Sequence, residues 1–561
     1  MNIMQRTPMI RRATLCFAMA TFLLSFAGDL QSAPAQSAAA DSQSTFTISG
    51  TVINELTGSP LDRTRVTLID TNNQATRWSV ITTENGHFAF TELPHGKFSL
   101  FAARRGFLRA LYQQHERFST AIVTGPALDS ENLLMKLAPL ATLSGKVLDE
   151  TGEGVRGANV ALFVENRAAG LKRIMSFNSD VTDDQGYYEF AALAPGDYFV
   201  SVTAKPWYAV HGFSSLPAGN NSQRRVPSAL EVAYPTTYYN GATDSQSATA
   251  INAHAGDHSQ VDIHLNPVPV LHLIVRVPQD PQRGAAPPAF EKRVFDNVEF
   301  FGADGMQQIS PGVFELTGVP AGRYAVHMQD PGTGQMQEAT EMNLTRDGQE
   351  IDGSQSQPAA SVKFTVQMPL QAQLPKELYV GMEDSHGQVL GFQPVEPSGH
   401  VALENARAGK YNILAFSNDK RYSVTRAVSA GVEISPGEFM VTSGSSQEVT
   451  IYVTAGVVSV EGFVKHGNKA ASGVMVALIP KNPQAHRDMF RRDQSDSDGS
   501  FVVRGVIPGA YTLVAVEDAW GFAWNQPEVL NRYIQHGQNL TVGPLMTQTV
   551  HLPEPVEVQP R

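Results

Sequence analysis

A pattern of apolar positions separated by glycine turns recurs five times along the chain and predicts its secondary structure. In the clearest copy, which begins at Gly186, apolar residues follow two, four and seven positions later. A second glycine lies ten positions after Gly186, and apolar residues return at twelve and fourteen. We call this spacing the arch motif; its five copies begin at Gly86, Gly186, Gly312, Gly399 and Gly499. Five matches to one spacing indicate an internal repeat.

Each arch motif predicts two β-strands that face one core. Steps of two residues place Tyr188 and Phe190 on one face of a first strand, and the same step recurs in the second. Gly186 supplies the positive φ that closes the turn before the first strand. Pro195-Gly196 forms the turn between the two strands. Each copy therefore predicts the order turn, strand, turn, strand.

The strands between the arch motifs predict the domain organisation. Strands that close one unit run into the strand that opens the next through joints of one or two residues, several of which contain proline. Short strands broken by glycine turns, without a helical period, predict an all-β fold: a tandem array of about five Greek-key β-sandwiches. The expected sandwiches span residues 45–138, 139–266, 267–368, 369–454 and 455–553, followed by a tail at 554–561.

Two details of this organisation can be tested directly. The third sandwich is expected to close with a strand at 362–368, and the fourth to open with a strand at 378–382. The short, proline-containing joints restrict the neighbouring backbone, so the five sandwiches are expected to lie in one elongated line.

The N-terminus carries the pattern of a secretory signal peptide, residues 1–35. Three arginines precede an uncharged apolar run at 13–27, and Ala33-Pro34-Ala35 provides a cleavage site. That run is shorter than the ~20 residues of a membrane span, although retention as an anchor is the alternative. Residues 36–44 form a flexible leader. We expect an exported protein, in the periplasm, on the outer surface or secreted.

The amino-acid composition excludes several classes of protein function and stabilisation. Cys16 is the only cysteine and lies in the signal peptide, so the mature chain is stabilised without disulfides. The 42% of hydrophobic residues is enough for several cores. A formal net charge of −12 argues against a nucleic-acid partner. No second apolar stretch is long enough for a membrane span in the mature chain.

The arch motif also carries a resemblance to a known family. The pattern T/S-D-x-x-G-x-[FY]-x-[FV]-x-x-[LV]-x-P-G-x-Y-x-[VL], preceded by strands with a glycine turn, resembles the carboxypeptidase regulatory-like domain. The resemblance covers residues 45–138, 139–266 and 455–553 well, and 267–368 and 369–454 only loosely, because their opening strands lack the glycine. It implies a prealbumin-like sandwich, related to Cna-B-type and starch-binding-like modules, with an accessory rather than a catalytic role.

Catalytic motifs are missing from the sequence. A zinc carboxypeptidase needs H-x-x-E with a distant third ligand, and the only such pair is His551 with Glu554, in the final strand and tail. The sequence contains no H-E-x-x-H, G-x-S-x-G or P-loop motif and no catalytic cysteine candidate. We therefore predict a protein that is not an enzyme and uses no cofactor.

Two groups of metal-ligand side chains are interpreted as structural. The first group is His254, Asp257, His258, Asp262 and His264. Alternation turns Val261, Ile263 and Leu265 to the core and leaves Asp262 and His264 facing water, so no metal site is predicted. The second group is Asp493, Asp496 and Asp498, which could hold calcium but align with ordinary hairpin turns elsewhere in the chain.

Aromatic residues provide the candidate binding site. Phe107, Trp207 and Trp520 each lie twenty-one residues after the first glycine of an arch motif, where a packed lid on the sandwich competes with a ligand platform. If residues 517–526 are extended, Trp520, Phe522 and Trp524 share one side. Exposed aromatic clusters mark binding surfaces, so these three residues are the predicted glycan site.

We therefore predict a non-enzymatic, exported multidomain binding protein. Its expected partner is a carbohydrate or another cell-surface or cell-envelope polymer. One alternative is a structural spacer or adhesin stalk without a small-molecule site. The other, suggested only by family association, is an accessory protein of an exported peptidase or outer-membrane receptor. The oligomeric state and the identity of the ligand are left open.

Overall fold

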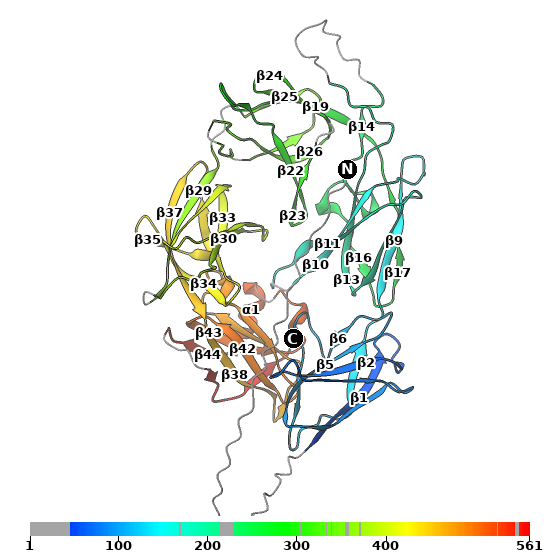
Figure 1. Cartoon of the computed structure of the whole chain (residues 1–561), viewed down its shortest axis with the longest axis vertical. Helices are drawn as coiled ribbons and strands as arrows, with labels where there is room; N and C mark the ends of the chain where they lie inside the picture. Colours follow the sequence, from blue (N-terminus) through cyan, green and yellow to red (C-terminus); the bar gives the residue numbers. More distant parts are fainter. Residues whose placement is uncertain are drawn as a thin grey trace, which may run out of the picture. The chain divides into compact units, whose positions relative to one another are not determined.

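The structure is a computed structural model that describes residues 45–167, 170–213, 228–302, 305–332, 334–337, 339–353, 358–369, 372–523, 526–544 and 549–561. The predicted signal peptide and leader lie outside the described residues. Residues 45–561 form one compact unit that is built almost entirely of β-strands (Figure 1). Five separate hydrophobic cores confirm the predicted all-β array of five sandwiches.

The first two sandwiches each pair two antiparallel-rich sheets. The first consists of β1 (Phe46–Asn54), β4 (His87–Leu93) and β8 (Leu133–Leu137) facing β2 (Arg65–Asp70), β3 (Arg77–Ile81), β5 (Gly96–Ala103), β6 (Ala110–Leu111) and β7 (Ile122–Thr124). The second consists of β9 (Ala141–Leu148), β12 (Tyr187–Leu193), β17 (His258–Gln260) and β18 (Ile263–His264) facing β10 (Asn159–Asn166), β11 (Arg173–Val181), β13 (Gly196–Thr203), β15 (Thr237–Tyr238) and β16 (Ile251–Ala253).

The third sandwich keeps this plan with additions, whereas the strands of the fourth are joined in one nine-stranded sheet. The third consists of β14 (Val232–Ala233), β19 (Val268–Arg276), β24 (Gly305–Ser310), β25 (Val313–Pro320) and β28 (Gln349–Asp352) with β22 (Ala289–Val294), β23 (Asn297–Phe301), β26 (Gly322–His327) and β27 (Thr340–Leu344), and a small hairpin, β20 (Gln279–Asp280) and β21 (Gly284–Ala285). The fourth consists of β29 (Ala360–Gln367), β30 (Tyr379–Asp384), β31 (Val389–Pro394), β32 (His400–Ala406), β33 (Gly409–Phe416), β34 (Arg421–Ser429), β35 (Val432–Ile434), β36 (Phe439–Val441) and β37 (Ser446–Gly456).

The fifth sandwich is the one with an α-helix among the described residues. Its strands are β38 (Val458–His466), β39 (Lys469–Ala470), β40 (Met475–Pro480), β41 (Arg491–Gln494), β42 (Ser500–Val506), β43 (Gly509–Val516), β44 (Gln538–Val542), β45 (Val550–His551) and β46 (Val556–Gln559). The helix α1 (Pro527–Ile534) follows the 3-10 turn η6 (Ala519–Gly521). In the part of the chain that the structure describes, no helix has the length and apolarity to cross a membrane.

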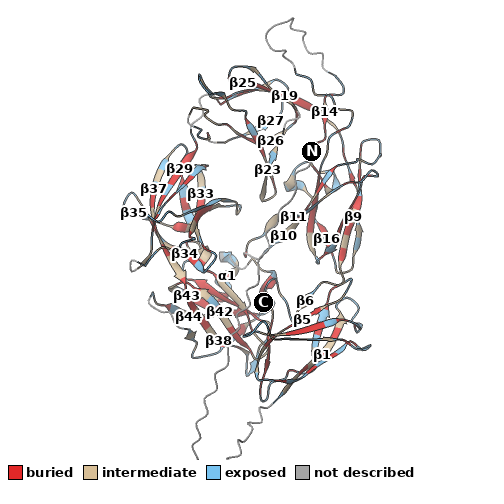
Figure 2. Ribbon diagram, viewed as in Figure 1, coloured by how far each residue is buried: buried red, intermediate tan, exposed pale blue. Residues whose placement is uncertain are grey.

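The arch motif has the predicted geometry. In the second sandwich, its first strand β12 pairs with β9 in one sheet and its second strand β13 pairs with β10 in the other, so the motif crosses between the sheets. The same division separates β4 from β5 in the first sandwich. The alternating buried and exposed positions along these strands are visible in Figure 2. Burying apolar rows from both sheets gives each sandwich its core.

Two features of the arch motif were not predicted. The residue six positions after the first glycine has a positive φ in every copy, whether or not it is glycine: Glu92, Ala192, Gly318, Asn405 and Gly505. These residues lie where the register of the first strand shifts, which is the signature of a β-bulge. The Thr182 hydroxyl, which precedes the turn, holds the turn against the neighbouring loop through two hydrogen bonds. It accepts from the Ala158 N–H at 2.9 Å and donates to the Val155 carbonyl at 2.6 Å.

Strand pairing moves the boundary between the third and fourth sandwiches. β29, expected to close the third sandwich, pairs with β32 and β37 and contributes Val362 and Phe364 to the fourth core. The strand that closes the third sandwich is β28, which pairs in parallel with β19. The expected opening strand at 378–382 is therefore the second element of its sandwich. The expected tail also belongs to the fold, because β46 pairs with β38 and β43.

The first and fifth sandwiches are in direct contact, so the expectation that all five lie in one line is wrong. Lys97 binds Asp496 at 2.9 Å, and Arg492 binds Glu116 at 2.8 Å. Backbone groups take part as well, since the Ser497 N–H donates to the Ala121 carbonyl at 2.9 Å. Short joints restrict the backbone locally, but they do not set the direction in which each successive sandwich points.

Candidate ligand-binding site

The predicted glycan platform is not an exposed aromatic face at Trp520. The ring of Trp520 is 8% exposed and packs against Met475, Ile479 and Val514 of its own sandwich. It also stacks on His115 of the first sandwich, with ring centroids 5.0 Å apart and an interplanar angle of 4°. Trp520 is thus a lid on the fifth sandwich that is covered in turn by the first.

The segment around Trp520 is not extended either. Ala519–Gly521 form the 3-10 turn η6, and α1 begins at Pro527, so alternation does not place the three aromatic residues on one side. Phe522 is half-buried, with its ring centroid 6.3 Å from that of Tyr533 and the Arg561 guanidinium 4.9 Å above it. Trp524 lies outside the described residues. The prediction of a site on Phe522 and Trp524 stays a prediction.

The three residues at the recurring aromatic position have different environments. Phe107 is half-buried and packs against the first core, and Trp520 is buried, as expected of lids. Trp207 is 88% exposed and contacts Tyr208 edge-on, with ring centroids 5.7 Å apart. The lid interpretation therefore holds for two of the three residues and is wrong for Trp207.

The histidine-containing group is arranged as the alternation predicted. Val261, Ile263 and Leu265 are buried, and His264 is exposed. Asp262 accepts hydrogen bonds from the Lys146 N–H at 2.9 Å and the Gln260 amide at 2.8 Å. His254 and Asp257 pair with each other at 3.0 Å. Within the described ranges, no group of three or more His, Cys, Asp or Glu residues is placed to hold a metal ion.

The aspartates of the fifth arch motif bond to protein donors, as the turn interpretation predicts. Asp493 accepts from the Val502 N–H at 2.7 Å, and Asp498 accepts from the Ser500 N–H at 3.0 Å. Asp496 has partners outside its own turn, the Lys97 ammonium and the Ala121 N–H, both at 2.9 Å. Burial raises the pKa of Asp493 to about 6 and also raises the pKa of Asp496.

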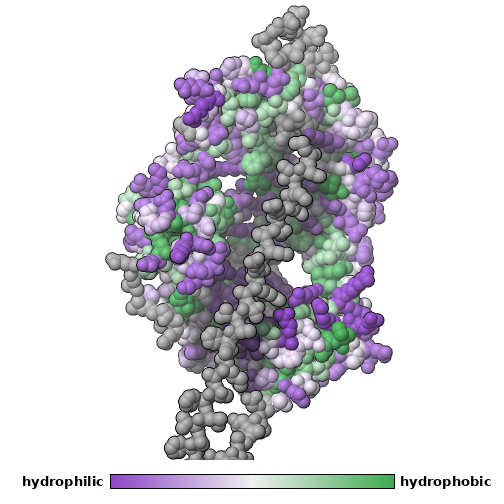
Figure 3. Space-filling model, viewed as in Figure 1, coloured by the Kyte–Doolittle hydropathy of each residue, from purple (hydrophilic) through white to green (hydrophobic). Residues whose placement is uncertain are grey.

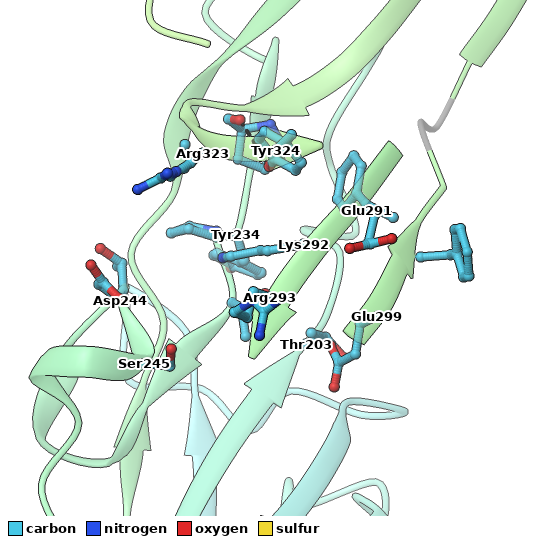
Figure 4. A pocket seen from close by; sticks show the side chains of 18 of the residues that line it. Thr203, Tyr234, Asp244, Ser245, Glu291, Lys292, Arg293, Glu299, Arg323 and Tyr324 are labelled. Carbon is cyan, nitrogen blue, oxygen red and sulfur yellow. Dashed lines mark hydrogen bonds between the residues drawn. The ribbon is translucent and has the colours of Figure 1, made fainter. Parts of the chain in front are cut away.

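A cleft lies between the second and third sandwiches. It has a volume of about 1560 Å³ and is partly open. Its walls come from the loops around Tyr234 and Asp244 in the second sandwich and from β22, β23 and β26 in the third (Figure 4). On the face seen in Figure 3, hydrophobic residues lie in small groups among hydrophilic ones, so exposed apolar side chains alone do not single out a binding surface.

The β22–β23 hairpin positions this cleft. Val294 is fully buried at its tip, against Phe163, Phe199 and Tyr238 of the second sandwich. The carboxylate of Asp296 accepts from the Ile174 N–H at 2.7 Å across the same contact. These contacts fix the position of the β22–β23 hairpin against the second sandwich. Side chains from both faces of the hairpin line the cleft.

Glu291 anchors the other end of the hairpin. Burial raises its pKa, but hydrogen bonds from His327 at 2.8 Å and from Arg407 of the fourth sandwich outweigh that effect and lower the pKa to about 2. Glu291 is thus an ionised structural group. A buried carboxylate that accepts from an arginine and a histidine fixes geometry at a desolvation cost.

The cleft combines an exposed ring with polar side chains. Phe300 on β23 is 72% exposed and lies at the cleft, with its ring centroid 6.0 Å from that of His327. Asp244, Ser245, Lys292 and Glu299 also line the cleft, with Lys292 and Glu299 on the face of the β22–β23 hairpin opposite to Phe300. Sequence reasoning missed this site because its residues come from different repeats, and Phe300, Lys292 and Asp244 occupy positions that the arch motif does not specify.

Comparisons with known proteins support the sandwich units. Residues 47–117 and 142–226 match the family model of the carboxypeptidase regulatory-like domain. Residues 452–542 match the model described as BOS complex subunit NOMO1-like, second beta sandwich domain. The search of curated proteins found no match. The expected resemblance is therefore confirmed for the first and second sandwiches, and the fifth matches a separate β-sandwich model.

Solved structures similar to this chain include pilins. The Bacillus anthracis TIE protein has 13% identity and a TM-score of 0.17 over 73% of this chain and 75% of its own. A streptococcal ancillary pilin has 13% identity and a TM-score of 0.21, covering 55% of this chain and 98% of the pilin. The minor pilin GBS52 of Streptococcus agalactiae has 12% identity and a TM-score of 0.20, covering 40% and 96%.

Proposed function

Because its first and second sandwiches match the carboxypeptidase regulatory-like domain, we propose that this chain is a non-enzymatic, exported binding protein whose ligand is a carbohydrate or another cell-envelope polymer. The observation that carries the proposal is the cleft between the second and third sandwiches, which offers an exposed aromatic ring beside polar side chains from both. Ligand sites are typically such clefts, with a few polar groups among apolar ones.

The chemistry of the cleft suits a saccharide. The exposed face of Phe300 can pack against the C–H groups of a sugar ring, and apolar contact with an aromatic ring contributes strongly to binding. The Ser245 hydroxyl can donate or accept a hydrogen bond, while the carboxylates of Asp244 and Glu299 accept from sugar hydroxyls. A partly open cleft admits one stretch of a longer polymer.

The test is affinity gel electrophoresis of the mature chain through a panel of neutral and acidic polysaccharides. We expect at least one polymer to retard the wild-type protein and Phe300→Ala to weaken that retardation. Phe463→Ala is the matched control, because Phe463 is 54% exposed on β38, in the fifth sandwich. The same retardation for Phe300→Ala and wild type would contradict the proposed site, and no retardation by any polymer would contradict the proposed ligand class.

The segment that contains Phe522 and Trp524 is a second proposed location for the same ligand class. Trp524→Ala in the same gels tests it independently of the cleft. If Trp524→Ala loses retention while Phe300→Ala keeps it, the site belongs to the fifth sandwich.

A structural spacer is the competing function, and the contact between the first and fifth sandwiches favours it. A spacer needs ordered sandwiches, and the ion pairs of Lys97 with Asp496 and of Arg492 with Glu116 supply order without any ligand. The two functions differ in the gels, because a spacer is retarded by none of the polymers.

A further inference from the structure

We propose that Trp207 and Glu150 of the second sandwich form a further saccharide-binding site, which takes neutral rather than acidic sugars. Trp207 lies on the loop that follows β13, and neither residue lines the cleft between the second and third sandwiches. The inference rests on the saccharide ligand class of the proposed function, but not on the cleft. An exposed indole and a carboxylate held by two phenol hydroxyls are the groups that carry it.

Trp207 is an aromatic ring that its own sandwich leaves uncovered. Its side chain is 88% exposed, whereas Phe107 and Trp520, at the same position of their repeats, are half-buried and buried. No other large apolar side chain within the described ranges is as exposed. Because an indole in water gains free energy when its apolar surface is covered, a ligand that packs on this ring binds favourably.

A β-turn fixes the indole in its exposed position. The Ala209 N–H donates to the Pro206 carbonyl at 3.1 Å, which places Trp207 at the second position of the turn. Beyond the turn, the Val210 N–H donates to the Leu230 carbonyl at 3.0 Å. The loop is therefore ordered before a ligand arrives, so binding costs little further conformational entropy.

Glu150 supplies hydrogen-bond acceptors close to this loop. Its Oε1 atom accepts from the Tyr208 hydroxyl, and its Oε2 atom accepts from the Tyr234 hydroxyl at 2.8 Å. Tyr208 contacts Trp207 edge-on, with ring centroids 5.7 Å apart, so a single side chain separates the carboxylate from the indole. Glu150 is exposed, and each of its oxygens keeps a further lone pair for a sugar hydroxyl.

The charge of Glu150 disfavours acidic sugars. Desolvation raises its pKa, but hydrogen bonds from Tyr208 and Tyr234 outweigh that effect and lower the pKa, so the carboxylate is ionised near neutral pH. In the described part of the chain, no cationic side chain lies within 4.0 Å of it, and Asp149 adds a second negative charge. The site therefore repels a carboxylate or phosphate substituent and attracts the hydroxyls of a neutral sugar.

A neutral saccharide satisfies both groups of the site. The C–H face of a sugar ring packs on the indole of Trp207, and neighbouring hydroxyls donate to the Glu150 carboxylate. Tyr234 lines the cleft and also binds Glu150, so the site adjoins the cleft (Figure 4). The Trp207 site thus adds a second contact surface for the ligand class proposed for the cleft.

The test is affinity gel electrophoresis of the mature chain through hydroxyethylcellulose, galactomannan and dextran, which are neutral, and through polygalacturonate, which is acidic. We expect at least one neutral polymer to retard the wild type, and Trp207→Ala to bind that polymer about tenfold more weakly. Trp207→Phe keeps a ring and should recover part of the binding. Phe177→Ala is the matched control, because Phe177 is 55% exposed on β11 of the same sandwich.

Glu150→Gln tests the carboxylate. The amide keeps the size of the side chain but loses the negative charge, so the neutral polymer should bind about threefold more weakly. The preference for the neutral over the acidic polymer should narrow in the same variant, because the repulsion is removed. An unchanged preference would contradict the role given to Glu150.

Tryptophan fluorescence gives a readout that does not depend on the gels. The retarding polymer should protect part of the wild-type emission from quenching by acrylamide, because it covers the exposed indole. Trp207→Phe should lose that protection. Equal protection in Trp207→Phe and wild type would show that the polymer does not cover Trp207.

The outcomes separate the inference from the proposed function. If the neutral polymers retard Trp207→Ala like wild type but retard Phe300→Ala less, the inference is wrong and the cleft site stands. If Trp207→Ala alone loses retardation, the inference stands and the cleft site is wrong. Retardation of the wild type by polygalacturonate alone would overturn the inference and leave the saccharide class intact, whereas no retardation by any polymer would overturn both.

Discussion

The arch motifs of the second and fifth sandwiches have the same turn chemistry in different surroundings. In the second sandwich, the Asp183 carboxylate accepts the N–H groups of Gln185 and Tyr187, both within its own turn. At the equivalent place in the fifth, Asp496 accepts the Ala121 N–H and binds the Lys97 ammonium of the first sandwich. One motif position thus closes a turn in one repeat and joins two sandwiches in another.

The aromatic position twenty-one residues after the turn glycine shows the same divergence. Trp207 is 88% exposed in the second sandwich, whereas Trp520 is 8% exposed in the fifth. Both lie just after the second strand of their arch motifs. The difference teaches that the repeat specifies which residues form the two core rows, while contacts between sandwiches decide what the outer residues do.

The largest expected difference in the free energy of unfolding is between alanine variants of the two tryptophans. Trp520→Ala should destabilise the fifth sandwich by about 3–5 kcal/mol, because a buried indole leaves a cavity. Trp207→Ala should change the free energy of unfolding by less than about 0.5 kcal/mol, as exposed substitutions usually do. Hydrogen exchange of the strand amides reports each sandwich separately. Equal protection of β43 in wild type and Trp520→Ala would show that Trp520 is not a core residue.

Alanine substitution of the two turn glycines should destabilise the second and fifth sandwiches by similar amounts. This tests whether the two turns have the same geometry. Gly186 has φ +75° and Gly499 has φ +79°, and an added Cβ would lie 2.5 Å from the Val147 and Val464 carbonyl oxygens, respectively. Alanine at either position should cost about 2–3 kcal/mol through strain and backbone displacement. Calorimetric unfolding of the two single variants measures this, and a large cost at only one position would break the equivalence of the turns.

Replacing the aspartate of either turn should lower the free energy of unfolding by a smaller amount, and by different amounts in the two sandwiches. Asp496→Asn leaves Lys97 without its carboxylate and should cost about 2 kcal/mol, less than a fully buried pair because 33% of the Lys97 side chain is exposed. Asp183→Asn should cost about 1 kcal/mol, since only turn hydrogen bonds weaken. A double-mutant cycle with Lys97→Met isolates the pair. A coupling energy indistinguishable from zero would show that the ion pair does not join the sandwiches.

The smallest expected effect is a pH dependence of the fifth sandwich. Burial raises the folded-state pKa of Asp493 to about 6, above the ordinary aspartate value of 3.8. The folded state therefore holds a proton that the unfolded state has released, so this group favours folding at low pH and loses that contribution as pH rises through about 6. Stability measured between about pH 4 and 7 should fall less steeply in Asp493→Asn than in wild type.

Asp180→Asn is the matched control for this pH profile. Asp180 accepts the Glu189 N–H at 3.0 Å, as Asp493 accepts the Val502 N–H at 2.7 Å in the fifth arch motif. If both variants flatten the profile of the fifth sandwich equally, the effect does not originate at Asp493.

Much of the fold was predictable because it depends on local spacing. Alternation places Tyr188 and Phe190 in one core row, and the structure confirms both as buried. The β29 error has a specific cause: opening and closing strands have the same alternation and run parallel side by side, so periodicity does not distinguish them. The left-handed bulge residues were missed because Glu92, Ala192 and Asn405 carry no glycine signal.

The candidate site was less predictable than the fold. The expected site on Trp520 and Phe522 assumed an extended segment, which the 3-10 turn and α1 replace. The cleft depends on Lys292 from one sandwich and Asp244 from another, and neither position recurs in the repeat. Residues brought together across two repeats leave no spacing that a single sequence reveals.

The sequence by itself determined the repeat, the β-sandwich and the two buried rows of each arch motif, because strand periodicity and turn geometry act over a few neighbouring residues. Only the tertiary structure decided that Asp496 meets Lys97, that Trp520 is covered by His115, and that Lys292 lines a cleft. These contacts depend on the orientation of whole sandwiches. Many weak interactions between residues far apart in the chain set that orientation, and no local pattern encodes it.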